Sequence, residues 1–276
     1  FVPASGAASR MFKNMFEFMN GENNEPTTDF EKKFFAEIEK FAFYDALNAA
    51  CEKNHNKGIK ALTEEGNYKA VVECMLKDCG LNYGFLPKAL LQFHKVENEV
   101  HTPLEEHLEE GAQYATDKDN NVNIHFTVSP EHKPEFEKLI NAKLPTFAKK
   151  WGVKYNVSMS EQKTSTDTVA VDMENNPYRE EGKLLFRPAG HGALIHNLNA
   201  IKDEVVSIKN IDNVANERLL PETAKWKMVL LGKALELRDT LHGYLRELDI
   251  VTNANIKDAC APVIPPYTGI GDEDIY

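Results

Sequence analysis

The segment "VPASGAASRMFK", residues 2–13, joins a short apolar run to a cluster of small residues that is followed by cations. Small side chains leave the main chain open, so a ligand could approach it closely. Successive N–H groups in such a turn can bind an anion, and a helix that begins near Ser9 would add its positive end. The guanidinium of Arg10 could then hold phosphate oxygens through two hydrogen bonds. The alternative is a tight strand-to-helix turn with a surface arginine.

Three further segments carry side chains suited to the same chemistry. They are "LPKALLQFH" with Lys88, the glycine-rich "RPAGHGAL" at residues 187–194, and "IKNIDNV" with Lys209 and Asp212. The ammonium groups of Lys88 and Lys209 could hold phosphate, and a carboxylate such as Asp212 could hold Mg²⁺. Structural roles stay open beside these: a surface lysine at 88, a helix entry at His191, and an Asx-turn at Asp212.

The composition of the chain limits the kinds of partner that it could bind. The chain has 276 residues, a net charge of −11 and 42% hydrophobic residues, which supports a sizeable core and disfavours a broad nucleic-acid-binding face. A small anion remains possible, because a few local cations suffice to hold it. No apolar run approaches the roughly 20 residues of a membrane helix, so we expect no membrane contact and a cytoplasmic location. The cysteines, which lack metal-ligand spacing, are expected to be free buried thiols in a reducing cytoplasm: Cys51, Cys74, Cys79 and Cys260.

The first part of the chain, residues 14–82, has helical periodicity. Apolar residues at helical spacing predict helices over 29–54 and 67–80, and Thr28 or Asp29 could cap the first of them. Its phenylalanines are expected to be core residues rather than a ligand site: Phe34, Phe41 and Phe43.

The remainder alternates between strands and helices. Strands are predicted at 122–129, 153–160, 168–172 and 204–212, and a short strand or extended stretch at 88–94. Helices are predicted at 102–115, 190–201 and 221–248, and a helix or helix pair, interrupted by Pro145, at 130–152. The helix at 102–115 has Thr102 as N-cap and Glu105 at the capping-box position. Its acidic run "EHLEEG" is expected to be solvated, and three histidines are expected to face solvent: His94, His101 and His107.

This alternation predicts an α/β fold with a mostly parallel sheet, in which ligands bind beyond the carboxyl ends of the strands. The loop after the first strand and the end of "IKNIDNV" would then face one crevice. A parallel sheet would thus bring segments that are far apart in the sequence to the same edge.

The four segments resemble those of the nucleotidyltransferase superfamily of sugar-phosphate nucleotidylyltransferases, especially its UDP-sugar pyrophosphorylase branch. Nearly the whole chain also looks like an uncharacterised bacterial family, a domain of unknown function placed in that superfamily. The superfamily opens with A-x-G-x-G-[ST]-R-[LM]. Gly6, Ser9, Arg10 and Met11 match this pattern, whereas Ala8 stands where the second glycine is usual. The resemblance implies a Rossmann-like, glycosyltransferase-A type fold, with a mostly parallel central sheet flanked by helices and a helical insertion at about 14–82.

The resemblance also implies roles for individual residues. Arg10 and Lys88 would touch the phosphates, and Asp212 would hold the catalytic Mg²⁺. Gln162 would read the pyrimidine edge. The remaining nucleotide contacts would come from two segments: Ala4, Ser5, Gly6, Ala7, Ala8 and Ser9 around the triphosphate, and Gly190, His191 and Gly192 at the base and sugar. A second metal-binding aspartate is expected late in the fold, and its candidates are Asp249 and Asp258.

The implied activity is Mg²⁺-dependent transfer of a nucleoside monophosphate from an NTP, with UTP favoured, to a sugar-1-phosphate or similar acceptor, with release of pyrophosphate. The alternative is a catalytically inactive nucleotide- or sugar-phosphate-binding protein of the same fold. A third reading is an interaction protein that uses the helices of residues 14–82 as its partner surface. The transferase-like domain is expected to span residues 1–262, and residues 263–276 are expected to be an irregular tail, cut before a further domain.

Overall fold

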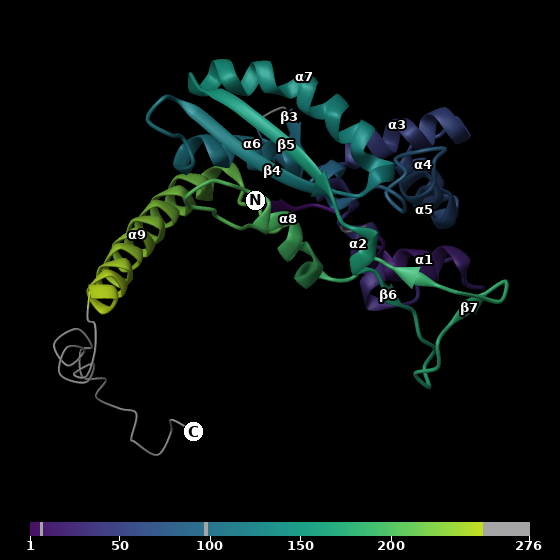
Figure 1. The fold of residues 1–276 in the computed structure, drawn as a ribbon. Helices are drawn as coiled ribbons and strands as arrows, with labels where there is room; N and C mark the ends of the chain where they lie inside the picture. Colours follow the sequence, from purple (N-terminus) through teal and green to yellow (C-terminus); the bar gives the residue numbers. More distant parts are fainter. Residues whose placement is uncertain (6–7, 97–98, 251–276) are drawn as a thin grey trace, which may run out of the picture. The chain divides into compact units, whose positions relative to one another are not determined.

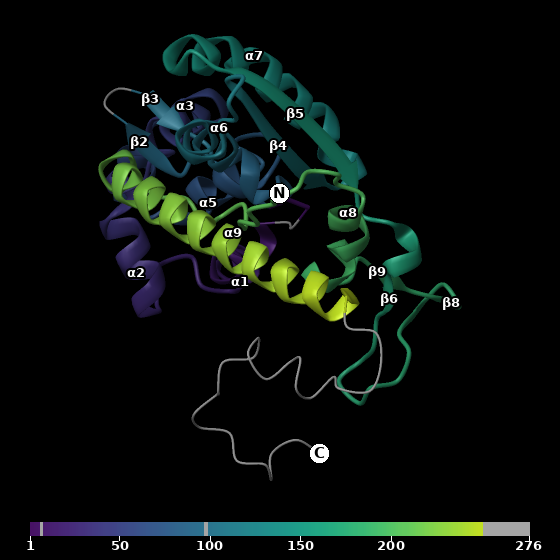
Figure 2. The same ribbon diagram turned by 60° about the vertical axis from the view of Figure 1, so that its left-hand side comes forward.

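A computed structural model describes residues 1–5, 8–96 and 99–250 of the chain. The chain divides into two units, Phe1–Ala224 and Lys225–Tyr276, which are described separately. The first unit is of the mixed α/β class, with a small parallel sheet, packed helices and three short antiparallel pairs of strands (Figures 1 and 2). The α/β class and the parallel sheet expected from the sequence are therefore confirmed.

The central sheet has the strand order β1 (Val2–Pro3), β4 (Asn121–Val128), β5 (Lys154–Glu161), and both pairings are parallel. A fourth segment lies against β1 without forming a regular strand. Lys209 N donates to Phe1 O at 3.1 Å, and Ile211 N donates to Pro3 O at 3.3 Å. These four segments run in one direction, so their carboxyl ends meet at one edge of the sheet.

Two long helices of the first unit cover one face of the sheet. The alternate β4 residues Val122, Ile124, Phe126 and Val128 are buried. They belong to one core cluster with apolar residues of α6 (Pro103–Tyr114) and α7 (Lys133–Trp151). On the other face, His125 bridges the hydroxyls of Ser158 and Ser160 at 2.8 and 2.7 Å. Parallel sheets usually carry near-continuous apolar strands because helices cover both faces. Here β4 and β5 alternate instead.

The predicted long helices are partly broken and partly continuous. The helix expected over 29–54 is two helices, α2 (Asp29–Ala36) and α3 (Tyr44–His55), with a 3-10 turn between them. In contrast, α7 continues through Pro145 and ends at Gly152, whose φ of +64° forms a left-handed cap. The predicted interruption at Pro145 is therefore wrong.

The helices near the start of the chain build their own core. They are α1 (Lys13–Asn20), α2, α3, α4 (Ile59–Glu64) and α5 (Tyr68–Leu76). Their buried side chains form a cluster separate from that of the sheet. Phe34 and Phe43 are buried in this cluster as predicted, whereas Phe41 is 39% exposed. Cys51 and Cys74 are buried free thiols as expected, whereas Cys79 is exposed, so the expectation of burial is wrong for it. Cys260 lies outside the described residues.

Short elements complete the first unit. The hairpin β2 (His94–Val96) and β3 (Glu99–His101) follows a 3-10 turn at Lys88–Leu90, so the predicted strand over 88–94 is largely wrong. The strand predicted at 168–172 is only β6 (Thr168–Val169), which pairs with β9 (Phe186–Arg187) outside the central sheet. A second hairpin, β7 (Arg179–Glu180) with β8 (Lys183–Leu184), lies between them in the sequence. The helix predicted over 190–201 is a 3-10 turn followed by α8 (Ile195–Asn199).

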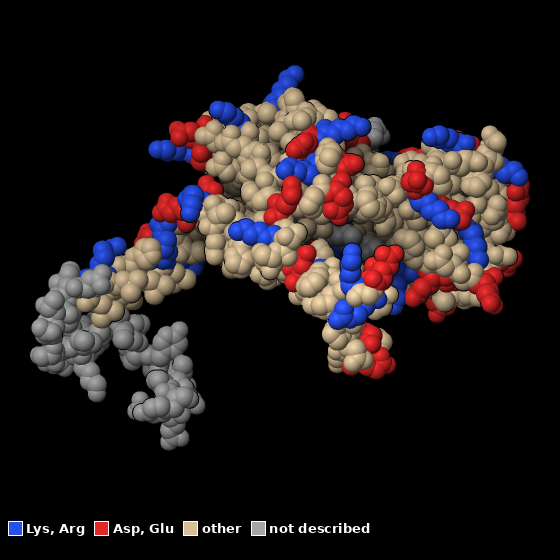
Figure 3. Space-filling view, turned by 45° about the vertical axis from the view of Figure 1, so that its right-hand side comes forward, with Lys and Arg blue, Asp and Glu red and all other residues tan. Residues whose placement is uncertain are grey.

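One long helix, α9 (Leu220–Ile250), begins in the first unit and forms the described part of the second. None of the helices described here is both long and apolar enough to cross a membrane. Basic and acidic side chains are interspersed on the face drawn in Figure 3.

Candidate functional site

The carboxyl edge of the sheet brings together three of the four segments singled out by the sequence. Lys88 Nζ lies 2.5 Å from Asp212 Oδ2, although 124 residues separate them. Both side chains are partly exposed, at 26% and 40%. The loop after β1 lies beside them, because Ala8 N donates to Leu86 O at 3.4 Å. An ammonium group and a carboxylate therefore meet next to the small-residue loop.

Two amides of that loop are already used by the protein. Ala4 N donates to Thr127 O at 2.9 Å, and Ala8, which is fully buried, donates to Leu86 O. Ser5 is half-buried. Gly6 and Ala7 lie outside the described residues. Ser9 is described only as backbone, within the 3-10 turn Ala8–Arg10. The amides of Ala4 and Ala8 are thus directed at carbonyls and not at a ligand.

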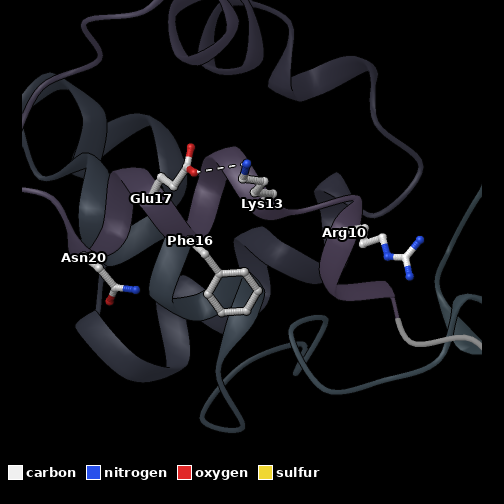
Figure 4. Close-up of a pocket in the computed structure, with 5 residues that line it drawn as sticks. All are labelled: Arg10, Lys13, Phe16, Glu17 and Asn20. Carbon is white, nitrogen blue, oxygen red and sulfur yellow. Dashed lines mark ion pairs between the residues drawn. The ribbon is translucent and has the colours of Figure 1, made fainter. Parts of the chain in front are cut away.

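Arg10 is the last residue of the 3-10 turn that precedes α1. It is exposed and lines an open pocket of about 400 Å³ with four residues of α1 (Figure 4): Lys13, Phe16, Glu17 and Asn20. Lys13 and Glu17 form an ion pair across this pocket at 3.7 Å.

The glycine-rich segment is joined to the end of β5. Gln162 Nε2 donates to Ala189 O at 3.2 Å, and Asn197 Nδ2 donates to Glu161 O at 2.9 Å. A Cβ atom added at Gly190 or Gly192 would meet no described atom within 4 Å. Packing therefore does not require glycine at either position. His191 begins the 3-10 turn His191–Leu194, and its side chain is outside the described residues.

Lys209 does not face a ligand, which corrects the expectation that it could hold phosphate. Its ammonium group forms an ion pair with both carboxylate oxygens of Glu110, and the Nζ–Oε1 distance is 2.6 Å. The two side chains are only 7% and 2% exposed. Each charge compensates the other's desolvation, and removing one partner would leave a buried charge without compensation. Lys209 is therefore a positioning residue for the chain segment that ends at Asp212.

His107 is buried as well, so the expectation that it faces solvent is wrong. Burial lowers its pKa to about 4, which leaves the imidazole neutral near pH 7. Its Nε2 lies 3.1 Å from Ile211 O. Because a carbonyl oxygen can only accept, Nε2 must carry the proton and donate it. This bond fixes the main chain one residue before Asp212.

The other carboxylates of α6 are also buried, although the sequence predicted a solvated acidic run. Glu106 lies 2.6 Å from His94 Nδ1, and burial raises the pKa of Glu106 to about 7. Two more carboxylates meet lysines of α7: Glu105 with Lys143 at 2.8 Å and Glu109 with Lys150.

The physical reason for this error is the position of α6. The helix is enclosed by the sheet, α7, the β2–β3 hairpin and segment 207–212 (Figure 2). Lysines of α7 and of segment 207–212, and His94 of the hairpin, contact its carboxyl groups. His101 is buried too, with its ring against Phe147, whereas the His94 side chain is 32% exposed.

No signal in the acidic run itself could have identified Glu110 and His107 as positioning residues. Their partners, Lys209 and Ile211, are about 100 residues away, at sequence separations of 99 and 104. Finding them would have required knowing that segment 207–212 lies along α6.

Asp212 is the only predicted metal ligand whose side chain is described. Asp249 is described as backbone of α9, and Asp258 lies outside the described residues. In the described part of the chain, no three His, Cys, Asp or Glu side chains gather in a group that could hold a metal ion. Proteins often bind Mg²⁺ through one or two carboxylates together with substrate phosphates. The partly exposed Asp212 carboxylate fits a site of that shared kind.

The chain belongs to the family described as domain of unknown function DUF4301, whose match covers residues 1–262. No curated protein and no solved structure matches the chain. The family description names no activity, so the function has to be argued from the site.

Proposed function

We propose that the carboxyl edge of the sheet binds an NTP with Mg²⁺, and that the protein transfers a nucleoside monophosphate to a sugar-1-phosphate or similar acceptor. The observation that carries the proposal is the Lys88–Asp212 contact at 2.5 Å, beside the loop that follows β1. In parallel α/β sheets, ligands bind beyond the carboxyl ends of the strands. The two charged groups lie at that edge.

The chemistry needs positioning and charge neutralisation. An acceptor phosphate oxygen forms a bond to the α-phosphorus of the NTP while the bond from that phosphorus to the leaving pyrophosphate breaks. Both reactants are anions, so cations and a metal lower the barrier by holding them in line. In this proposal Lys88 binds phosphate oxygens and Asp212 holds Mg²⁺ together with those oxygens. Arg10 contacts the triphosphate from the loop side, and no residue acts as a covalent nucleophile.

The Lys88–Asp212 pair must open for both groups to act. While the pair is closed, the ammonium compensates the carboxylate, so Mg²⁺ alone competes with Lys88 for Asp212. The triphosphate gives Lys88 a replacement anion, and Mg²⁺ gives Asp212 a replacement cation. Nucleotide and metal are therefore expected to bind cooperatively.

The base would lie near the glycine turn. The space around Gly190 and Gly192 is open to a ligand, since no described atom lies within 4 Å of a Cβ at either position. Gln162 reaches this turn, although its Nε2 is engaged by Ala189 O. UTP is the favoured donor because of the likeness of this turn to that of uridylyl-transferring enzymes.

The test is pyrophosphate release with each of the four NTPs, Mg²⁺ and a panel of sugar-1-phosphates. Turnover is expected with UTP, and Lys88→Met or Asp212→Asn should each lower it by about 100-fold or more, as expected for the loss of an electrostatic contact to a transition state. The matched controls are Lys57→Met and Glu65→Gln, which break an exposed ion pair of 2.7 Å in the helical region. The absence of turnover in every mixture would exclude the transferase.

A second candidate is a nucleotide- or sugar-phosphate-binding protein without catalysis. It is favoured by the engagement of the Ala4 and Ala8 amides with protein carbonyls, which leaves fewer donors for a triphosphate. Thermal shifts with UTP and UDP-sugars, with and without Mg²⁺, separate the two candidates. Stabilisation without turnover indicates the binding protein, and no shift with any nucleotide rejects both.

A further inference from the structure

The long helix α9 presents a row of large apolar side chains to solvent. Five leucines in the segment from Leu230 to Leu248 are 40–64% exposed: Leu230, Leu237, Leu241, Leu245 and Leu248. A contiguous apolar surface of this kind usually marks an interaction site. The row runs along most of the described second unit.

The spacing of these residues is that of a coiled coil. Written in heptads, the a positions are Ala234, Leu241 and Leu248, and the d positions are Leu230, Leu237 and Tyr244. Apolar residues at a and d form a seam that faces a partner helix. The 19 residues from Leu230 to Leu248 would form a seam of about 28 Å at 1.5 Å per residue.

We propose that α9 pairs with α9 of a second copy of this chain in an antiparallel coiled coil. The sequence matches its own reverse in side-chain size. When Leu241 lies opposite Leu237 of the second copy, Leu248 lies opposite Leu230, and the small Ala234 lies opposite the large Tyr244. Alternation of small and large residues across a seam fills it without cavities.

The charges next to the seam select the same orientation. In the antiparallel register Lys233 lies opposite Glu247 of the second copy, twice by symmetry, and Leu231 lies opposite Leu245. A parallel pair would instead bring Lys233 against Arg238 of the second copy, because g positions then face the following e positions. The antiparallel pair has one unfavourable contact, Arg238 with its own copy.

That contact is mitigated within each chain. Arg238 Nη2 lies 2.7 Å from Asp239 Oδ1, so the guanidinium has a carboxylate beside it. The second copy also explains why Leu245, which is neither a nor d, is apolar, since it meets Leu231 across the seam. The occupant of this face is therefore another α9 and not an unrelated apolar partner.

The first measurement is the mass of the full chain by sedimentation equilibrium. A mass of twice 31.2 kDa is expected at high concentration, and Leu237→Glu should give the monomer mass. Circular dichroism checks that this variant keeps its helices. A monomer at every concentration, with the wild-type chain folded, would overturn the proposal.

Orientation is tested by disulfide trapping in a background with Cys79→Ser and Cys260→Ser. A mixture of Leu237→Cys and Leu241→Cys chains should give the mixed disulfide, identified by mass spectrometry, in excess over either self-disulfide. Self-disulfides in excess would indicate a parallel pair and overturn the antiparallel register. Lys233→Glu should weaken dimerisation roughly tenfold, and adding Glu247→Lys should restore it, as expected for two exposed ion pairs per dimer. Failure of the second change to restore it would also contradict the register.

Discussion

Helices α6 and α9 differ in opposite ways from what their side chains would suggest, since α6 buries charged residues and α9 exposes apolar ones. The α6 segment has four glutamates within six residues, and all four are less than 9% exposed. In α9, five leucines between Leu230 and Leu248 are 40–64% exposed, although leucines at such spacing are core residues in most helices. Charge does not keep α6 at the surface, because α7 and segment 207–212 bring lysines to its carboxylates and His94 of the hairpin contacts Glu106. The environment of a helix is set by its neighbours as much as by its own side chains.

The difference also teaches where the stability of each helix originates. Three carboxylates of α6 are stabilised by pairs with Lys209, Lys143 and Lys150, so the helix depends on its partners being present. In α9 the Lys233–Glu236 ion pair, at 2.8 Å, is exposed and joins residues three apart in sequence. Exposed pairs contribute about 0–1 kcal/mol, whereas loss of one partner of a buried pair costs about 3–5 kcal/mol.

The largest effect is expected for Lys209→Met, which leaves Glu110 buried without its cation. The free energy of unfolding should fall by about 3–5 kcal/mol. It can be measured by urea denaturation with Trp151 fluorescence in a Trp226→Phe background. Adding Glu110→Leu should recover most of the loss. The matched change on α9, Lys233→Met, should cost less than about 0.5 kcal/mol. Equal costs for the two lysines would remove the contrast between the helices.

Truncation of a leucine should destabilise the protein far more in α6 than in α9, although α9 is the helix with the row of leucines. Leu108→Ala on α6 removes a side chain that is 0% exposed and should cost about 2–5 kcal/mol, because it leaves a cavity. Leu237→Ala on α9 removes a side chain that is 52% exposed. In dilute solution, the same urea titration should show a change within about 0.5 kcal/mol. A large loss from Leu237→Ala under these conditions would mean that α9 is packed against its own chain.

The pH dependence of stability should reveal the burial of His107. Its pKa is about 4 in the folded state and 6.5 in the unfolded state, so the unfolded state binds the proton more tightly. Stability is therefore full above pH 6.5 and is lost as the pH falls towards 4, by up to about 3 kcal/mol. His107→Gln, which can still donate to Ile211 O, should flatten this part of the stability curve. An unchanged curve would contradict the assignment.

Glu106 should act in the other direction. Its pKa is raised from 4.5 to about 7, so the folded state binds the proton more tightly. The contribution is present below pH 4.5 and is lost as the pH rises through 7, by up to about 3 kcal/mol. Glu106→Gln should remove the decline between these values. Urea titrations from pH 4.5 to 8 would measure it, and a decline of equal size in the variant would exclude Glu106 as its source.

The smallest effect is expected at the N-cap of α6. Thr102 Oγ1 accepts from Glu105 N, and Glu105 accepts from Thr102 N at 2.9 Å. Thr102→Ala should lower the free energy of unfolding by about 1–2 kcal/mol. Thr28→Ala removes the same capping box from α2, where the bonds are only part-buried, and should cost less. The reverse order would indicate that burial does not strengthen the cap.

Local motifs in the sequence predicted much of the fold. The capping box of Thr102 and Glu105 placed the start of α6 correctly, because the bonds involved span three residues. The periodicity of residues 122–129 and 153–160 predicted β4 and β5 within a residue or two. The burial of the Glu110 and His107 side chains was not predicted, because their partners lie about 100 residues further along the chain.

The candidate site shows the same division. The rule that parallel strands end at one edge predicted that the loop after β1 and the end of segment 207–212 face one crevice. Lys88 was added to this site only through the resemblance, and it contacts Asp212. Their roles towards phosphate and Mg²⁺ stay predictions. The Lys209 error arose because alternation along a strand cannot tell which face meets α6. The Ala4 and Ala8 amides donate to the carbonyls of Thr127 and Leu86 because of how β1 and the loop are aligned with those segments. The sequence of the loop alone does not reveal this alignment.

The position of β1 has a consequence for the time course of folding. It is an inner segment of the sheet, with hydrogen bonds to β4 at a separation of 123 residues and to segment 207–212 at a separation of 206. A ribosome adds about 5–20 residues per second, so β1 emerges roughly 10–40 s before the last of these neighbours. During that interval the carbonyl groups of Phe1 and Pro3 lack the hydrogen bonds that segment 207–212 later provides. The helices of residues 13–76, whose contacts are local, can meanwhile form their core.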